Sequence, residues 1–182
     1  MKREELEHVL RAASRIVNQR DFLVVGSAAI LASFDDEVLP PEASRSDEAD
    51  LAPFDDVDGE KSLQIEGSLG QGSRFHDAFG YYADGVSFTT AVAPDGWEDR
   101  LVVFGPPGAE PGRGLCLEPH DLAAAKLAAG RTKDYEFVAA LVEAGLINAE
   151  TLLERVARLP GGRVPPAYLR RARTWVESRS TW

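Results

Sequence analysis

Two carboxylates one residue apart, Glu48 and Asp50, have the types and spacing best suited to chemistry in this chain. They lie in residues 48–52, which we expect to form a strand that Pro53 ends. Because side chains alternate along a strand, both carboxylates would project from one face. Neighbouring negative charges repel, so this arrangement costs stability unless a cation lies between them. The spacing therefore predicts a site for a divalent cation beside a triphosphate.

A turn of small residues, Gly26 and Ser27, precedes this pair in the chain. It follows Phe22 to Val25, a short apolar run typical of a buried strand, and leads into AAILASF, which has helix-forming composition. Such a turn lets a phosphate approach the backbone N–H groups at the start of a helix. We therefore expect Gly26 and Ser27 to bind the triphosphate.

Lys126 interrupts an otherwise apolar helix, predicted over Pro119 to Gly130. A buried lysine costs free energy unless its charge has a partner, and triphosphate oxygens or the carboxylate pair would serve. The alternative is that Lys126 extends to water along the helix edge. At the following turn, Arg131 either pairs with Asp134 or binds a phosphate through its planar guanidinium group.

The other elements follow from periodicity and turn residues. Asp84 is a candidate for a further carboxylate at the site, but its place before Gly85 suits a hairpin turn, which we favour. We divide the chain into an α/β core, residues 1–114, and a helical region, residues 115–182, packed as one unit. The remaining expectations are helices over 3–19, 60–69, 132–144, 148–159 and 165–177, antiparallel strands over 79–86, 86–92 and 100–104, a surface loop over 35–46 and a linker over 105–114.

Composition limits the class of protein. The formal charge of −10 argues against a general nucleic-acid-binding surface, which needs an excess of Lys and Arg. No apolar run reaches the length of a membrane span, and residues 1–20 are too charged for a signal peptide. The single Cys116 cannot form an internal disulfide, so we expect a cytoplasmic protein without a membrane partner.

Charge is unevenly distributed along the chain. Residues 35–60 contain eleven acids and one base, whereas residues 163–182 contain five arginines and one acid. One hypothesis is that the basic segment 163–182 binds RNA or a nucleotide. The alternative, which explains the excess of arginine equally well, is that these residues form a solvated helix face that pairs with the acidic half of the chain.

The order of these motifs resembles the nucleotidyltransferase superfamily, which has the fold of polymerase β. The segments FHDAFGYYADGVSFTTAVAPDGWEDRLV and LEPHDLAAAKLAAGRTKDYEFVAALVEAGLI are similar to a bacterial family of nucleotidyltransferases of the DUF6036 type. That family is distantly related to the nucleotidyltransferase toxins of abortive-infection systems. The resemblance covers roughly residues 5–160. It implies an α+β fold in which a small mixed sheet with flanking helices is followed by a helical C-terminal half.

The resemblance also implies a reaction. A nucleoside monophosphate would move from an NTP to a hydroxyl acceptor on RNA, a protein or a small molecule, with Mg²⁺ or Mn²⁺ as cofactor. Lys126 corresponds to the site lysine of the toxins and Asp134 to the aspartate that opens their final motif, although Leu122 stands where the toxins have Thr. The implied catalytic residues are Glu48, Asp50 and Lys126, the metal ligands Glu48 and Asp50, and the nucleotide-binding residues Gly26, Ser27, Arg131 and Asp134.

Three departures from the superfamily pattern keep other functions open. Glu48 stands where Asp is usual, the interval from Ser27 to Glu48 contains an inserted loop over 35–47, and the third carboxylate of active members has no assigned residue. One alternative is a catalytically degenerate protein that binds a nucleotide or a partner. Another is the toxin of a two-gene system, with an antitoxin as partner.

Overall fold

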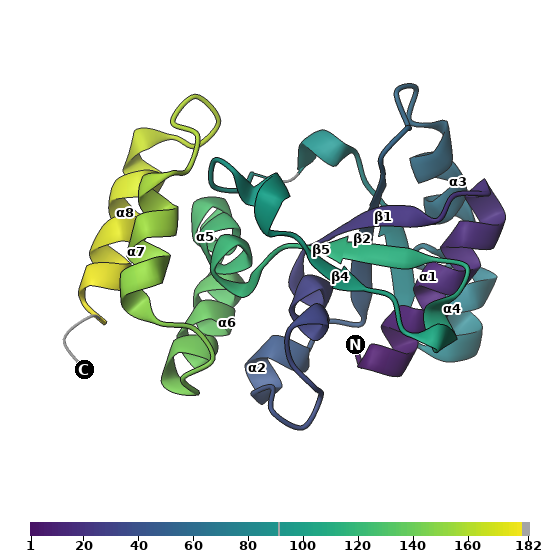
Figure 1. Ribbon diagram of the computed structural model, residues 1–182, viewed down its shortest axis with the longest axis horizontal. Helices are drawn as coiled ribbons and strands as arrows, with labels where there is room; N and C mark the ends of the chain where they lie inside the picture. Colours follow the sequence, from purple (N-terminus) through teal and green to yellow (C-terminus); the bar gives the residue numbers. More distant parts are fainter. Residues whose placement is uncertain (91, 180–182) are drawn as a thin grey trace.

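The computed structural model describes residues 1–90 and 92–179, and shows an α+β fold with a five-stranded mixed sheet (Figure 1). The strand order is β3-β2-β1-β5-β4. β1 pairs antiparallel with β2 and parallel with β5, while β2 pairs parallel with β3 and β4 pairs antiparallel with β5. The strands are β1 (Asp21–Val25), β2 (Glu48–Pro53), β3 (Tyr82–Gly85), β4 (Val102–Phe104) and β5 (Arg113–Cys116).

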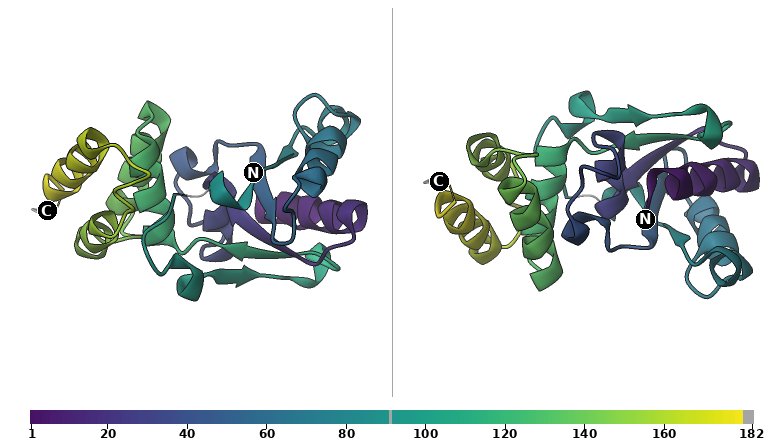
Figure 2. Two further views of the ribbon diagram at one scale, coloured as in Figure 1. Left: turned by 90° about the horizontal axis from the view of Figure 1, so that it is seen from above. Right: turned by 90° about the horizontal axis from the view of Figure 1, so that it is seen from below.

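The central strand β1 is almost wholly apolar, and Phe22, Leu23 and Val24 have no exposed surface. A strand with neighbours on both edges and covered faces needs such a continuous apolar run. The helix α1 (Arg3–Val17) lies against the sheet with its stripe Leu6, Val9, Leu10 and Ala13 fully buried. It packs on α3 (Glu60–Leu69), which also contacts β3 (Figure 2).

Four helices form the C-terminal half, as the sequence predicts. They are α5 (Pro119–Ala129), α6 (Thr132–Glu143), α7 (Ala149–Ala157) and α8 (Pro166–Glu177), and they lie together at one end of the molecule (Figure 1). Gly130 ends α5 with a φ of +73°, a left-handed conformation that favours glycine. The remaining helical segments are α2 (Pro41–Ser44), α4 (Arg74–Phe79), η1 (Ser27–Ala32), η2 (Phe88–Thr90), η3 (Trp97–Arg100) and η4 (Pro107–Ala109).

A buried charge network joins the helices to the preceding segment. Asp121 on α5 has no exposed side-chain surface, and the guanidinium group of Arg100 donates to it at 2.7 and 3.0 Å. Arg155 on α7 adds a charge contact, with Nε 3.1 Å from Oδ1 of Asp121 but without hydrogen-bond geometry. These contacts hold α5 and α7 together next to the sheet.

Several predicted elements differ from the structure. The segment after Gly26 is a 3₁₀ helix, and the loop over 35–46 contains the short helix α2. The predicted strand over 79–86 is limited to β3, which is parallel to β2 rather than part of a hairpin. Within 86–92, residues 88–90 form η2, residues 86, 87 and 92 are in neither a helix nor a strand, and residue 91 lies outside the described part of the chain.

The predicted linker over 105–114 contains the start of β5, which takes a place between β1 and β4. β5 also spans residue 114, where we place the division between core and helical region. That division stays a prediction.

Candidate functional site

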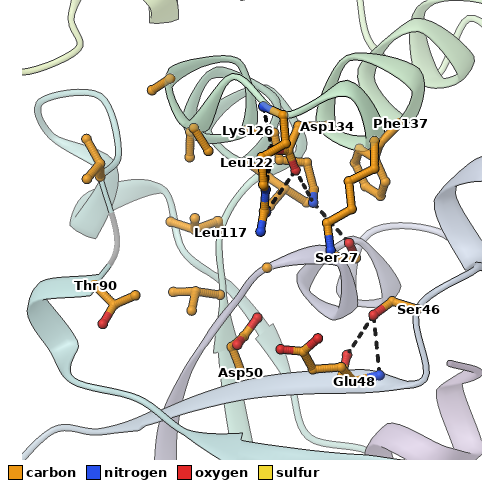
Figure 3. A pocket seen from close by; sticks show the side chains of 18 of the residues that line it. Ser27, Ser46, Glu48, Asp50, Thr90, Leu117, Leu122, Lys126, Asp134 and Phe137 are labelled. Atoms are coloured by element: carbon orange, nitrogen blue, oxygen red, sulfur yellow. Dashed lines mark hydrogen bonds and ion pairs between the residues drawn. The ribbon is translucent and has the colours of Figure 1, made fainter. Parts of the chain in front are cut away.

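Glu48 and Asp50 extend from the same face of β2 into one pocket, as strand alternation predicts (Figure 3). Both residues are half-buried. In the antiparallel pairing of β1 with β2, Asp50 lies opposite Val25, the last residue of β1. This register brings Asp50 beside the turn that begins at Gly26, so the two predicted motifs meet.

Gly26 is in contact with Asp50 in a way that only glycine allows. A Cβ atom on residue 26 would lie 2.1 Å from Oδ2 of Asp50, and the φ of Gly26 is +69°. The backbone conformation and the close carboxylate therefore both require a residue without a side chain. The role of Gly26 is to let the Asp50 carboxylate lie against the turn.

The pKa of Asp50 is raised to about 7, first because the carboxylate is buried and then because Glu48 and Asp84 are close. Lys126 acts in the opposite direction and stabilises the ionised form. The crowding of carboxylates thus makes a local excess of negative charge that one lysine does not cancel. A divalent cation would relieve it.

Asp84 joins this cluster from the neighbouring strand. In the parallel pairing of β2 with β3, Asp84 lies opposite Asp50, and Tyr82 lies opposite Glu48. Burial and the charge of Glu48 raise the pKa of Asp84, while the backbone N–H of Gln71 stabilises its carboxylate. The hairpin interpretation of Asp84 is therefore wrong, since the residue lies within a strand beside the carboxylate pair.

Glu48 has two neighbours of its own. The hydroxyl of Tyr82 donates to Oε2 of Glu48 at 3.4 Å. The hydroxyl of Ser46 contacts the backbone of Glu48, with the N–H of Glu48 3.3 Å from Oγ. Burial and the charges of Glu48 and Asp84 raise the pKa of Tyr82 to about 12, so its hydroxyl remains a donor toward the carboxylate.

Lys126 reaches the pocket from α5 and is buried, with its side chain 8% exposed. Its ammonium group donates to Oγ of Ser27 at 3.0 Å, lies 3.6 Å from Oδ1 of Asp134, and sits 4.4 Å from the centre of the Phe137 ring. Burial lowers the pKa of Lys126, and Asp134 opposes that effect. The alternative in which Lys126 extends to water is wrong.

Arg131 and Asp134 pair at the start of α6. The guanidinium group of Arg131 donates to both carboxylate oxygens of Asp134, at 2.7 and 3.0 Å. Burial alone would raise the pKa of Asp134, but Arg131 and Lys126 together lower it. The Asp134 side chain is fully buried and contacts both the Lys126 ammonium group and the Arg131 guanidinium group. The Arg131 side chain is 59% exposed, so it lies at the open side of the pocket.

The pocket has a volume of about 600 Å³ and lies between the sheet and the C-terminal helices. All seven residues predicted for the site line it. Figure 3 shows Glu48, Asp50 and Ser27 at its polar end, and Thr90 and Leu117 toward the other end. The further lining residues include apolar Val92, Leu117, Leu122, Ala125 and Val164, and charged Arg45, Lys133 and Arg163.

The donor set fits a divalent cation that is shared with a phosphate ligand. Among residues 1–90 and 92–179, no group of three or more His, Cys, Asp or Glu side chains could hold a metal ion alone. Mg²⁺ commonly takes one or two carboxylates and completes its coordination with water and substrate phosphates. Glu48 and Asp50 match that pattern.

The chain belongs to a family described as nucleotidyltransferases of unknown function (DUF6036), which matches residues 4–159. Comparisons with curated proteins and with solved structures gave no significant match. The α+β architecture agrees with the fold that this family implies. Within the described residues, the helices are too short or too polar to cross a bilayer.

Proposed function

We propose that this protein is a Mg²⁺- or Mn²⁺-dependent nucleotidyltransferase that transfers a nucleoside monophosphate from an NTP to a hydroxyl acceptor. The observation that carries the proposal is the hydrogen bond of 3.0 Å between Lys126 and Ser27, 99 residues apart, in the pocket that also contains Glu48 and Asp50. A metal-bound triphosphate needs this combination of cation, hydroxyl donor and paired carboxylates. Family membership supports the reaction class.

The triphosphate would lie between the Gly26–Ser27 turn and α5. Because Oγ of Ser27 accepts a hydrogen bond from Lys126, its own O–H is available to donate to a phosphate oxygen. The ammonium group of Lys126 stabilises negative charge on the departing pyrophosphate. Asp134 and Phe137 keep that ammonium group in place, and Arg131 adds positive charge at the pocket mouth.

Glu48 and Asp50 are the residues that would hold the divalent cation. When bound, the cation supplies charge neutralisation for the phosphate oxygens of the NTP. The crowding of Glu48, Asp50 and Asp84, which adds to burial in raising the pKa of Asp50, is the observation that favours such a ligand. Phosphate oxygens and water would complete its coordination.

The reaction itself is a displacement at phosphorus. The acceptor oxygen forms a bond to the α-phosphorus while the bond from that phosphorus to the pyrophosphate oxygen breaks. The acceptor proton would go to Asp84, which lies opposite Asp50 on β3, is not among the residues that line the pocket, and has a pKa raised by burial and by Glu48. The protein supplies no nucleophile; its residues act by position and charge, and Asp84 acts as the proton acceptor.

The test is a transfer assay with each of the four NTPs labelled at the α-phosphate. Wild-type protein, Mg²⁺ and the RNA, protein and small-molecule fractions of a bacterial lysate are incubated, and released pyrophosphate and the labelled fraction are measured. We expect one fraction to take up label, and Asp50→Asn to abolish this. The matched control is Asp58→Asn, since Asp58 is exposed and outside the pocket. Undiminished transfer by Asp50→Asn would refute the assignment.

Toxicity is a separate part of this proposal. If the protein is the toxin of a toxin–antitoxin pair, its expression arrests growth, and Asp50→Asn relieves the arrest. Harmless expression of an active enzyme contradicts a toxin role and favours a housekeeping one.

A second candidate function is nucleotide or partner binding without catalysis. It is favoured by the glutamate at position 48, where active superfamily members usually have the shorter aspartate. This candidate predicts saturable binding of an NTP with no release of pyrophosphate in any lysate fraction.

A further inference from the structure

Tyr82 is the nearest polar neighbour of the Glu48 carboxylate on the adjacent strand. The two residues are partners in the parallel pairing of β2 with β3, so their side chains lie on the same face of the sheet. The Tyr82 hydroxyl is 3.4 Å from Oε2 of Glu48. The phenol hydroxyl donates and the carboxylate oxygen accepts in this contact.

Glu48 needs such a neighbour more than an aspartate would. Glutamate has one more methylene group and one more rotatable bond than aspartate, so its carboxylate samples more positions unless a contact restricts it. The contacts of Ser46 hold only the backbone of Glu48 and leave the side-chain torsions free. The carboxylate itself contacts the Tyr82 hydroxyl and the side chain of Asp50, and of these two neighbours Tyr82 is the one that carries no negative charge.

The Tyr82 ring is in turn held by His76 on α4. The two ring centres are 4.8 Å apart, and the rings are tilted by 52°. Nδ1 of His76 accepts a hydrogen bond from the backbone N–H of Gly72 at 2.9 Å, which fixes the orientation of the imidazole. Ser73 caps the helix that carries His76. The chain of contacts from Gly72 through His76 to Tyr82 therefore restricts where the hydroxyl points.

We propose that Tyr82 is a positioning residue that orients the carboxylate of Glu48 toward the divalent cation shared with Asp50. This inference rests on the proposed function, because it assumes that Glu48 and Asp50 hold a metal. Hydrogen bonds to a ligating carboxylate fix its orientation and strengthen metal binding. Tyr82 would thus restrict the longer side chain of the glutamate at position 48.

The preceding residue provides a matched control. Tyr81 is also half-buried, and its hydroxyl forms a hydrogen bond of 2.7 Å with Nδ1 of His8, away from the carboxylates. Tyr81→Phe therefore removes a hydroxyl and a hydrogen bond from the same segment without touching Glu48. Tyr82→Phe removes the hydroxyl in question and keeps the ring against His76.

The test is calorimetric titration of Mn²⁺, alone and as its complex with each of the four NTPs, into wild type, Tyr82→Phe, Tyr81→Phe, Glu48→Asp and the double variant Glu48→Asp/Tyr82→Phe. We expect Tyr82→Phe to weaken Mn²⁺ binding about three- to tenfold and Tyr81→Phe to leave it unchanged. In the Glu48→Asp background, Tyr82→Phe should have no further effect, because the shorter carboxylate no longer reaches the hydroxyl. A thermal melt of each variant confirms that it is folded.

The outcomes separate this inference from the proposed function. If wild type binds Mn²⁺ and Tyr82→Phe binds it equally well, the positioning role is overturned and the metal site stands. If Tyr82→Phe weakens binding by the same factor in both backgrounds, the effect does not pass through Glu48 and the inference is also overturned. If wild type binds an NTP equally well in EDTA and with Mn²⁺, the metal site and the positioning role fall together.

Discussion

Oδ2 of Asp50 lies 2.1 Å from the point that a Cβ atom on residue 26 would occupy, so Gly26 and Asp50 can meet only because residue 26 is a glycine. This contact joins the end of β1 to the carboxylate pair on β2. Gly26 therefore allows both the backbone conformation of the turn and the position of the Asp50 carboxylate in the site.

Gly26→Ala should displace the Asp50 carboxylate and weaken Mn²⁺ binding at least tenfold. The control is Gly59→Ala, because Gly59 has a similar φ of +74° but open space where its Cβ would lie. Gly59 is left-handed helical with ψ 8°, so Gly59→Ala carries a backbone cost of about 1–2 kcal/mol. Gly26 has ψ −164°, a conformation restricted to glycine, so Gly26→Ala carries a larger backbone cost and adds the steric overlap with Asp50. Denaturant unfolding and Mn²⁺ titration check this. Equal losses of stability, with metal binding intact in both, would contradict it.

Asp50→Asn should stabilise the metal-free protein, and more at pH 8 than at pH 5. The folded-state pKa of Asp50 is raised to about 7, so the folded protein favours the neutral carboxyl group. That stabilisation is complete below the unfolded-state pKa and is lost as the pH rises through about 7. An uncharged amide avoids the loss, with an expected gain on the order of 1–3 kcal/mol at pH 8.

Thermal melts in EDTA measure this effect, at roughly 2–4 °C per kcal/mol for a domain of this size. Asp58→Asn serves as the control, since Asp58 is exposed and outside the pocket. A melting temperature for Asp50→Asn that follows wild type at both pH values would show that Asp50 is not under electrostatic strain.

Lys126→Met should lower NTP affinity by about ten- to a hundredfold with little loss of stability. Methionine keeps most of the buried stem, and removal of the ammonium group also removes its desolvation cost, while Asp134 keeps its bidentate partner Arg131. Lys133→Met is the matched control because Lys133 lines the same pocket from an exposed position. Titration of each NTP into both variants measures the two affinities. An equal loss of NTP affinity in Lys126→Met and Lys133→Met would mean that Lys126 contributes only general positive charge.

Asp84→Asn should reduce the rate of pyrophosphate release by two or more orders of magnitude and leave the affinity for the NTP within about threefold of wild type. The amide cannot accept the acceptor proton, and the residues that line the nucleotide pocket are unchanged. Single-turnover kinetics separate the two quantities. A variant that retains full turnover would remove Asp84 from the reaction.

The sequence predicted the parts of the site that depend on local periodicity. Glu48 and Asp50 share a face because strands alternate, and Lys126 is conspicuous because it interrupts an apolar helix. Gly130 and Pro119 mark the ends of α5 through backbone chemistry that needs no tertiary context.

The parts that were missed depend on long-range pairing. Asp84-Gly85 has the composition of a hairpin turn, but its pairing with β2 places it in a strand. β5 is short and follows prolines and glycines, yet it lies inside the sheet between β1 and β4, where Gly114 packs closely against Val24. A Cβ on Gly114 would be 2.9 Å from Cγ2 of Val24, a constraint that no local pattern reveals.

The central claim is that Glu48 and Asp50 form a metal site for an NTP, and calorimetric titration of each NTP with Mg²⁺ tests it most directly. Wild type, Asp50→Asn and Asp58→Asn are compared with Mg²⁺ and with EDTA. We predict Mg²⁺-dependent binding of at least one NTP by wild type and Asp58→Asn, and its loss in Asp50→Asn. No binding of any NTP by wild type, or equal binding by Asp50→Asn, would contradict the claim.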